Sequence, residues 1–91
     1  MQKTIAKFNY YRDAGHGWVA VKKSILAKIG IADKITAYSY QRGKMAYLEE
    51  DCDLSTFMTA MEAYMGKTPT LNVVDHGNYS WVRSQETYQN S

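Results

Sequence analysis

The sequence predicts an α+β fold in which a single, mostly antiparallel sheet of about five strands packs against one short and one long helix. Three observations lead to this fold class. Apolar and polar residues alternate over residues 4–10, apolar residues recur at three- and four-residue steps over residues 54–65, and glycine-containing turns separate the shorter extended segments. The expected order is strand, strand, helix, strand, strand, helix, strand.

The N-terminal part of the chain is expected to form two strands. The apolar side of the first strand consists of Thr4, Ala6, Phe8 and Tyr10. Residues 13–17 (DAGHG) contain two glycines and an aspartate, which is typical of a turn. Residues 18–21 (WVAV) then begin the second strand.

A short helix is expected over residues 25–29. Ser24 precedes it and is expected to cap its N-terminus. Gly30 follows it and fits a left-handed C-terminal cap, which would fold Ile31 back onto Leu26.

Residues 35–50 (ITAYSYQRGKMAYLEE) predict a hairpin around Gly43, in a register that pairs Tyr40 with Met45. One face then carries Tyr38, Tyr40, Met45 and Tyr47. The other carries Ile35, Ala37, Ser39, Ala46 and Leu48. Two orientations remain open: the helices cover the face with the small residues and leave the tyrosines exposed, or the tyrosines and Met45 form the core.

The second helix is expected over residues 54–65, because its apolar residues fall on one stripe. Gly66 and Pro69 end it. Residues 70–74 form the last strand and residues 75–78 a turn. We expect residues 1–91 to form a single domain, with residues 79–91 as a loosely ordered tail.

Composition narrows the class of protein. A chain of 91 residues has room for one small domain, and its net charge of +2 does not make nucleic acid the obvious partner. Cys52 is the only cysteine, so no intramolecular disulfide can form, which favours a reducing compartment. The sequence has no apolar run of signal-peptide or membrane-helix length, and we therefore expect a cytoplasmic protein with no membrane contact.

Four of the nine acidic residues fall within the segment YLEEDCD, at positions 47–53. Asp53 immediately precedes the long helix, where an N-cap belongs, and Asp51 lies close before it. Carboxylates at a helix N-terminus are stabilised by the unpaired amides and the dipole, so we expect this to be the main role of both residues. Glu49 and Glu50 lie too early in the segment for this role. Folding does not account for them, and we expect them to bind a partner.

Metal and catalytic interpretations of the same segment are weaker. His16, His76 and Cys52 could join the carboxylates as metal ligands, but no two of them have the spacing of a ligand pair, so no metal and no cofactor are expected. Neighbouring carboxylates raise the pKa of Cys52, which we expect to be a buried, inert thiol. No catalytic residue is assigned.

A recognition surface is the preferred interpretation. Its expected residues are Tyr38, Tyr40, Tyr47, Glu49 and Glu50, because aromatic side chains beside charges are typical of interfaces. One alternative is a nucleic-acid or nucleotide-binding module that stacks bases on the tyrosine face, although the glutamates would repel phosphate. The other is a small metal-dependent enzyme that uses the acidic residues.

Three blocks, DAGHGW (13–18), YSYQRG (38–43) and YLEEDCD (47–53), resemble a family of short proteins from phages, plasmids and other mobile elements. The resemblance covers positions 8 to 65 and implies no activity and no catalytic residue. It implies a non-enzymatic protein that binds a host protein or protein complex, for example in host takeover or in inhibition of restriction or CRISPR defence. Nucleic acid is the second choice of partner, and a homodimer is compatible with this context.

Overall fold

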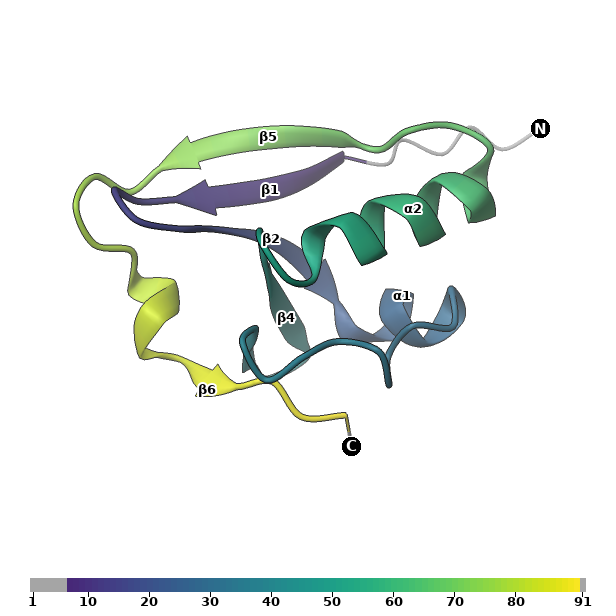
Figure 1. The fold of residues 1–91 in the computed structure, drawn as a ribbon, viewed down its shortest axis with the longest axis horizontal. Coiled ribbons are helices and arrows are strands. Elements are labelled where there is room, and N and C mark those ends of the chain that lie inside the picture. The colour runs from purple at the N-terminus through teal and green to yellow at the C-terminus, as the bar shows by residue number, and fades with distance from the viewer. Residues whose placement is uncertain (1–6, 91) are drawn as a thin grey trace.

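The computed structural model describes residues 7–90, which form one mixed sheet with two helices on one of its faces (Figure 1). The strand order is β5-β1-β2-β4-β3-β6, with β5 parallel to β1 and all other neighbours antiparallel. The elements are β1 (Lys7–Arg12), β2 (Gly17–Lys22), α1 (Lys23–Lys28), β3 (Tyr40–Arg42), β4 (Met45–Glu49), α2 (Leu54–Met65), β5 (Thr70–Asp75), the 3₁₀ helix η1 (Trp81–Ser84) and β6 (Glu86–Thr87). The predicted α+β class, with one sheet and a short and a long helix, is confirmed.

The helices cover the face of the sheet that carries the small and aliphatic residues. Val19 and Val21 of β2, and Ala46 and Leu48 of β4, pack there against side chains of the helices, namely Leu26, Phe57 and Met61. Of the predicted first strand, Thr4 and Ala6 lie outside the described residues, whereas Phe8 and Tyr10 pack at the margin of this core. Within residues 7–90, no helix is both long and apolar enough to cross a bilayer.

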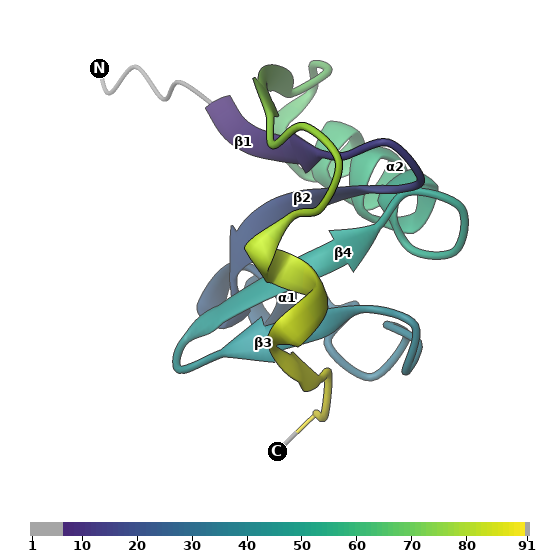
Figure 2. The same ribbon diagram turned by 90° about the vertical axis from the view of Figure 1, so that its left-hand side faces the viewer.

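The opposite face of the sheet is also covered. Figure 2 shows η1 lying in front of β2 and β4, with the two helices behind the sheet. Val82 of η1 is buried there against Trp18, Ala20 and Tyr47, which form a second, smaller core. The tyrosine face of β4 is therefore not open to solvent.

The chain after Asn78, expected to be a loose tail, packs onto the sheet as far as it is described. Strand β6 pairs with β3, placing Thr87 opposite Tyr40. The Tyr88 ring is buried in the main core, and its hydroxyl donates to the carbonyl oxygen of Ala32 at 2.7 Å.

The C-terminus of α1 has the predicted left-handed cap. Gly30 has φ +80°, the amide of Ile31 donates to the carbonyl of Leu26 at 2.9 Å, and both side chains lie in the core. The expected Ser24 cap is wrong, because α1 begins at Lys23 and the N-cap position is held by Lys22 without a side-chain hydrogen bond.

The hairpin between β3 and β4 forms around Gly43, but its register differs from the prediction. Gly43 has φ +58° and begins a two-residue loop closed by Arg42 and Met45, so that Tyr40 faces Tyr47. The predicted pairing of Tyr40 with Met45 is displaced by two residues, a shift that leaves every side chain on its face. Residues 35–39 do not belong to the strand and form a loop.

Candidate functional site

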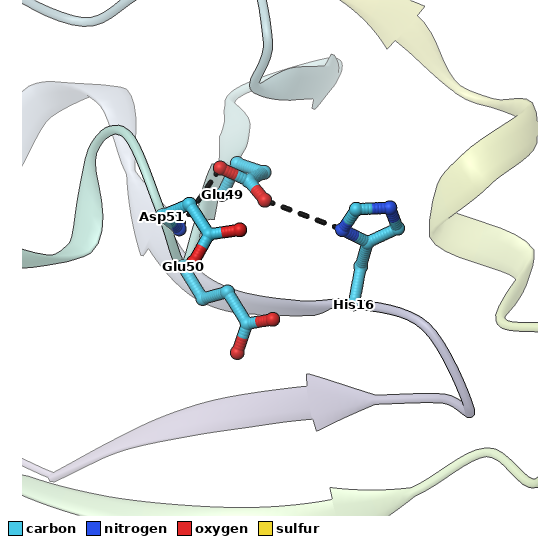
Figure 3. Close-up of side chains that lie close together, drawn as sticks. All are labelled: His16, Glu49, Glu50 and Asp51. Carbon is cyan, nitrogen blue, oxygen red and sulfur yellow. Dashed lines mark hydrogen bonds and ion pairs between the residues drawn. The ribbon is translucent and has the colours of Figure 1, made fainter.

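Two segments that are distant in the sequence meet at the end of β4. The amide of Glu50 donates to the carbonyl of Gly17 at 2.9 Å, which places the turn after β1 beside the connection between β4 and α2. As a result His16 lies next to three carboxylates (Figure 3). One ligand atom from each of these four residues lies within 4.8 Å of the others; we call His16, Glu49, Glu50 and Asp51 the His16 cluster.

Glu49 is buried, contrary to the expectation that it faces a partner. Only 7% of the residue is exposed. Its Oε1 accepts from the backbone amides of Asp51 at 2.9 Å and Cys52 at 3.0 Å, so the side chain fixes the turn that leads into α2. Its Oε2 lies 3.4 Å from Nδ1 of His16 (Figure 3). Glu49 therefore has a structural role in addition to any binding role.

Glu50 and Asp51 remain closer to solvent. Oε1 of the half-buried Glu50 accepts from the Tyr10 hydroxyl at 2.6 Å. Burial, followed by this hydrogen bond to a carboxylate, raises the pKa of Tyr10 far above its usual value, so the phenol remains a donor at neutral pH. Asp51 is exposed and lies outside the helix, just before Asp53 at the N-terminus of α2.

Asp53 occupies the N-cap position of α2, as predicted, but its carboxylate does not cap the helix. It is fully buried and accepts from the amide of Thr36 at 3.1 Å, from the hydroxyl of Thr36 at 2.8 Å, and from the hydroxyl of Ser39. The Ser39 oxygen in turn accepts from the amide of Glu49 at 2.9 Å. Asp53 therefore holds the loop over residues 35–39 against the start of α2.

Asp13 links the β1–β2 turn to η1. Its carboxylate accepts from the amides of Gly15 and His16, both at 3.0 Å, and from the amide of Ser80 at 2.8 Å. It also forms a bidentate pair with Arg83, at 2.5 Å to Nε and 2.8 Å to Nη2. This buried carboxylate positions both His16 and the segment that covers the sheet.

Arg83 lies beside one buried and one exposed aromatic ring, those of Trp18 and Tyr79. Its guanidinium carbon lies 5.4 Å from the centroid of the Trp18 ring and 5.5 Å from that of Tyr79. Trp81 packs edge-on against Tyr47, with ring centroids 5.3 Å apart. The exposed fractions are 71% for Tyr38, 66% for Tyr79 and 40% for Trp81. We call Tyr38, Tyr79, Trp81 and Arg83 the aromatic surface.

A cavity of about 290 Å³ connects the aromatic surface with the His16 cluster. Its lining residues are His16, Trp18, Tyr38, Tyr40, Glu49, Asp51 and Arg83. A larger cavity, of about 630 Å³, lies between β1 and β2, but its lining contains neither a carboxylate nor a histidine. The small cavity therefore brings together His16, Glu49, Asp51 and Arg83, whereas Glu50 lines a neighbouring cavity of about 220 Å³ that also includes His16.

The structure divides the residues that were predicted to bind a partner. Tyr38, Tyr40 and Glu49 line the small cavity, Glu50 lies beside it in the His16 cluster, and Tyr47 is buried in the second core. Sequence reasoning missed Tyr79, Trp81 and Arg83, because they belong to the segment that was expected to be loose. The sequence feature that could have indicated them is the number of aromatic residues in that segment, which is high for a loosely ordered tail.

Neither Cys52 nor His76 belongs to the His16 cluster. Cys52 is exposed, which contradicts its expected burial, and loss of hydration followed by the carboxylate of Glu49 raises the pKa of its thiol. The raised pKa disfavours the thiolate, as expected. His76 is outside the His16 cluster: its Nδ1 is 2.6 Å from the Ser80 hydroxyl, and its ring stacks on Tyr11 with centroids 4.8 Å apart.

No protein-family model, no curated protein and no solved structure matches this chain. The functional interpretation consequently depends on the geometry of the His16 cluster and the aromatic surface.

The Asp13–Arg83 pair predicts a specific loss of stability in acid. The Arg83 hydrogen bonds, with those from the three amides, hold the pKa of Asp13 well below its usual range, despite the opposing effect of burial. Because the folded-state pKa is depressed, this stabilisation is present above the unfolded-state value of about 4 and is lost as the pH falls below it. We expect Asp13→Asn to have a lower free energy of unfolding at pH 7 and a smaller further loss between pH 5 and pH 2.

Urea denaturation followed by tryptophan fluorescence, at pH values from 2 to 7, measures this difference. Subtracting the Asp13→Asn profile from the wild-type profile removes the contribution of the other carboxylates. Parallel profiles would show that Asp13 does not titrate differently in the folded and unfolded chains.

Proposed function

We propose that this chain is a small, non-enzymatic interaction protein that binds a protein partner through the aromatic surface. One observation carries the proposal. Five large hydrophobic residues are exposed within residues 7–90, and two of them are linked through Arg83: Tyr38 lines the small cavity together with Arg83, and the Tyr79 ring lies 5.5 Å from the Arg83 guanidinium. A third, Trp81, belongs to the same η1 segment as Arg83. Tyrosine, tryptophan and arginine are the residues that most often dominate binding energy at protein interfaces.

The aromatic surface is also preorganised. Arg83 is held by two hydrogen bonds to the buried Asp13, and Trp81 packs against both Tyr47 and Tyr11. Side chains that are fixed before binding lose little conformational entropy on association, so more of the contact energy appears as affinity. This supports a binding role over a merely incidental exposure of aromatic rings.

The charges at the edge of the surface favour a basic partner. Asp13 neutralises Arg83, whereas Glu50 and Asp51 lie on the other side of the cavity as solvent-accessible carboxylates. Carboxylates at this edge attract lysine and arginine side chains and repel phosphate, which favours a protein over a nucleic acid. The resemblance to mobile-element proteins suggests that the partner belongs to the host, and the single cysteine is compatible with action in its cytoplasm.

Affinity capture from host lysate with matched variants tests this proposal. Tyr38→Ala and Tyr79→Ala are each expected to weaken recovery of the partner by about 10-fold or more, mainly through faster dissociation. Tyr64→Ala is the control, because Tyr64 is an exposed tyrosine on α2 that takes no part in the aromatic surface. Wild type and Tyr64→Ala should recover the partner equally.

Treatment of the lysate with nuclease separates the alternatives. A protein partner is still captured after treatment, whereas loss of recovery would show that nucleic acid is bound instead. Equal recovery by Tyr38→Ala, Tyr79→Ala and the wild type would show that the binding surface lies elsewhere.

A further inference from the structure

We infer that the His16 cluster binds one divalent transition-metal ion, of the class represented by Mn²⁺, through the imidazole of His16 and the carboxylates of Glu49, Glu50 and Asp51. The inference goes beyond the proposed function and does not depend on it. It replaces the expectation, drawn from ligand spacing in the sequence, that no metal is bound.

The geometry of the His16 cluster suits a single ion. The four ligand atoms come from two segments and lie within 4.8 Å of one another. Ligands at about 2.0–2.2 Å from one metal are about 3–4.4 Å apart, so small side-chain rotations bring all four into a first coordination sphere. One nitrogen and three carboxylate ligands form a mixed set that suits the harder and borderline divalent ions.

The concentration of negative charge in the His16 cluster favours binding of a cation. Three carboxylates share the site, and repulsion between like charges at such distances is costly. Among residues 7–90, the only ion pair formed by any of the three is the one between Glu49 and His16. Arg12 and Arg83 line the adjoining cavities but form no ion pair with these carboxylates. A divalent cation would remove this repulsion.

The carboxylate of Glu49 is only partly satisfied by hydrogen bonds among the described residues. Oε1 of Glu49 accepts from two amides, but Oε2 of this nearly buried side chain accepts no hydrogen bond and points toward His16 (Figure 3). Polar groups of nearly buried side chains are usually hydrogen-bonded, so this oxygen is available to a cation beside His16.

Hydrogen bonds from residues outside the proposed coordination sphere also orient the carboxylates, as is common for metal ligands. The Tyr10 hydroxyl holds Glu50, and the amides of Asp51 and Cys52 hold Glu49. Such outer contacts fix the direction in which ligand oxygens point and raise metal affinity.

Titration of the full chain with Mn²⁺ by isothermal calorimetry, after removal of metal with a chelator, tests the inference. We expect one Mn²⁺ per chain, and about 10-fold or greater weakening in each of His16→Ala and Asp51→Asn. Both side chains are exposed, so circular dichroism should show that both variants fold. Glu49 is left unchanged, because its replacement would remove the turn contacts with Asp51 and Cys52.

Two controls have matched chemistry. Asp75→Asn changes an exposed aspartate on β5, outside the cluster, and Cys52→Ser removes the adjacent thiol; both should bind Mn²⁺ as the wild type does. Absence of saturable binding up to about 1 mM Mn²⁺ would overturn the inference. Unchanged affinity in His16→Ala and Asp51→Asn, or loss of binding in Cys52→Ser, would also overturn it. Failure of Mn²⁺ binding would leave the proposal about the aromatic surface unchanged, whereas Mn²⁺ binding would neutralise the carboxylates that favour a basic partner.

Discussion

Replacing Asp53 by alanine is expected to lower the free energy of unfolding by about 3 kcal/mol, more than the roughly 1 kcal/mol expected for loss of an ordinary N-cap. The buried carboxylate accepts three hydrogen bonds from Thr36 and Ser39, and Ser39 also contacts the amide of Glu49. Its removal leaves these donors without partners beside the core. Leaving a buried donor unpaired costs about 1–3 kcal/mol, and partial hydration of the half-buried Thr36 limits the total.

Urea denaturation in the presence of a chelator measures this effect, with Asp51→Ala as the matched control. Asp51 lies two positions earlier and is exposed, so its removal should change the free energy of unfolding by less than about 0.5 kcal/mol. If both variants lost only a few tenths of a kcal/mol, Asp53 would be contributing through the helix terminus alone. The buried network would then not stabilise the fold.

Local sequence patterns were sufficient to predict those elements whose position is determined by residues close together in the sequence. The apolar stripe over residues 54–65 matches α2 because one face of that helix meets the core. Gly30 ends α1 in the left-handed conformation because the position needs φ +80°, which glycine adopts without steric cost. In both cases the pattern that predicts the element is formed by residues a few positions apart.

The hairpin register was predictable only up to a shift of two residues. Side chains alternate across a sheet with a period of two, so pairing Tyr40 with Met45 or with Tyr47 gives the same faces. The choice between the two registers is made by the turn, in which Gly43 takes the first position with positive φ. Apolar patterning does not contain that information.

The candidate site was the least predictable part, because distant segments assemble it. Asp13 and Arg83 are 70 positions apart, and His16 reaches Glu49 only because β2 and β4 are neighbours. The glutamates were recognised as unusual, but their spacing in the sequence gave no indication of a histidine beside them. For the same reason, the sequence did not indicate that η1 covers Tyr47, because the two are distant in the chain.

Tyr47→Ala is expected to lower the free energy of unfolding by about 3–4 kcal/mol, whereas Tyr38→Ala should change it by less than about 0.5 kcal/mol. The two tyrosines were predicted to share one binding face. Tyr47 is instead 5% exposed, packed between β2 and η1, where its ring meets those of Trp81 and Tyr11. Tyr38 lies in the loop before β3 with most of its surface in solvent.

Tyr47→Phe distinguishes the contribution of the Tyr47 ring to stability from that of its hydroxyl. No hydrogen bond of this hydroxyl is found within residues 7–90, and burial raises its pKa, so the phenol is neutral at pH 7 and phenylalanine should retain nearly all of the stability. Urea denaturation of Tyr38→Ala, Tyr47→Ala and Tyr47→Phe ranks their free energies of unfolding directly.

Tyr47→Ala should also weaken partner capture, because Trp81 loses the ring against which it packs, whereas Tyr47→Phe should capture the partner as the wild type does. Equal destabilisation by Tyr38→Ala and Tyr47→Ala would place Tyr38 in the core and would remove it from the aromatic surface.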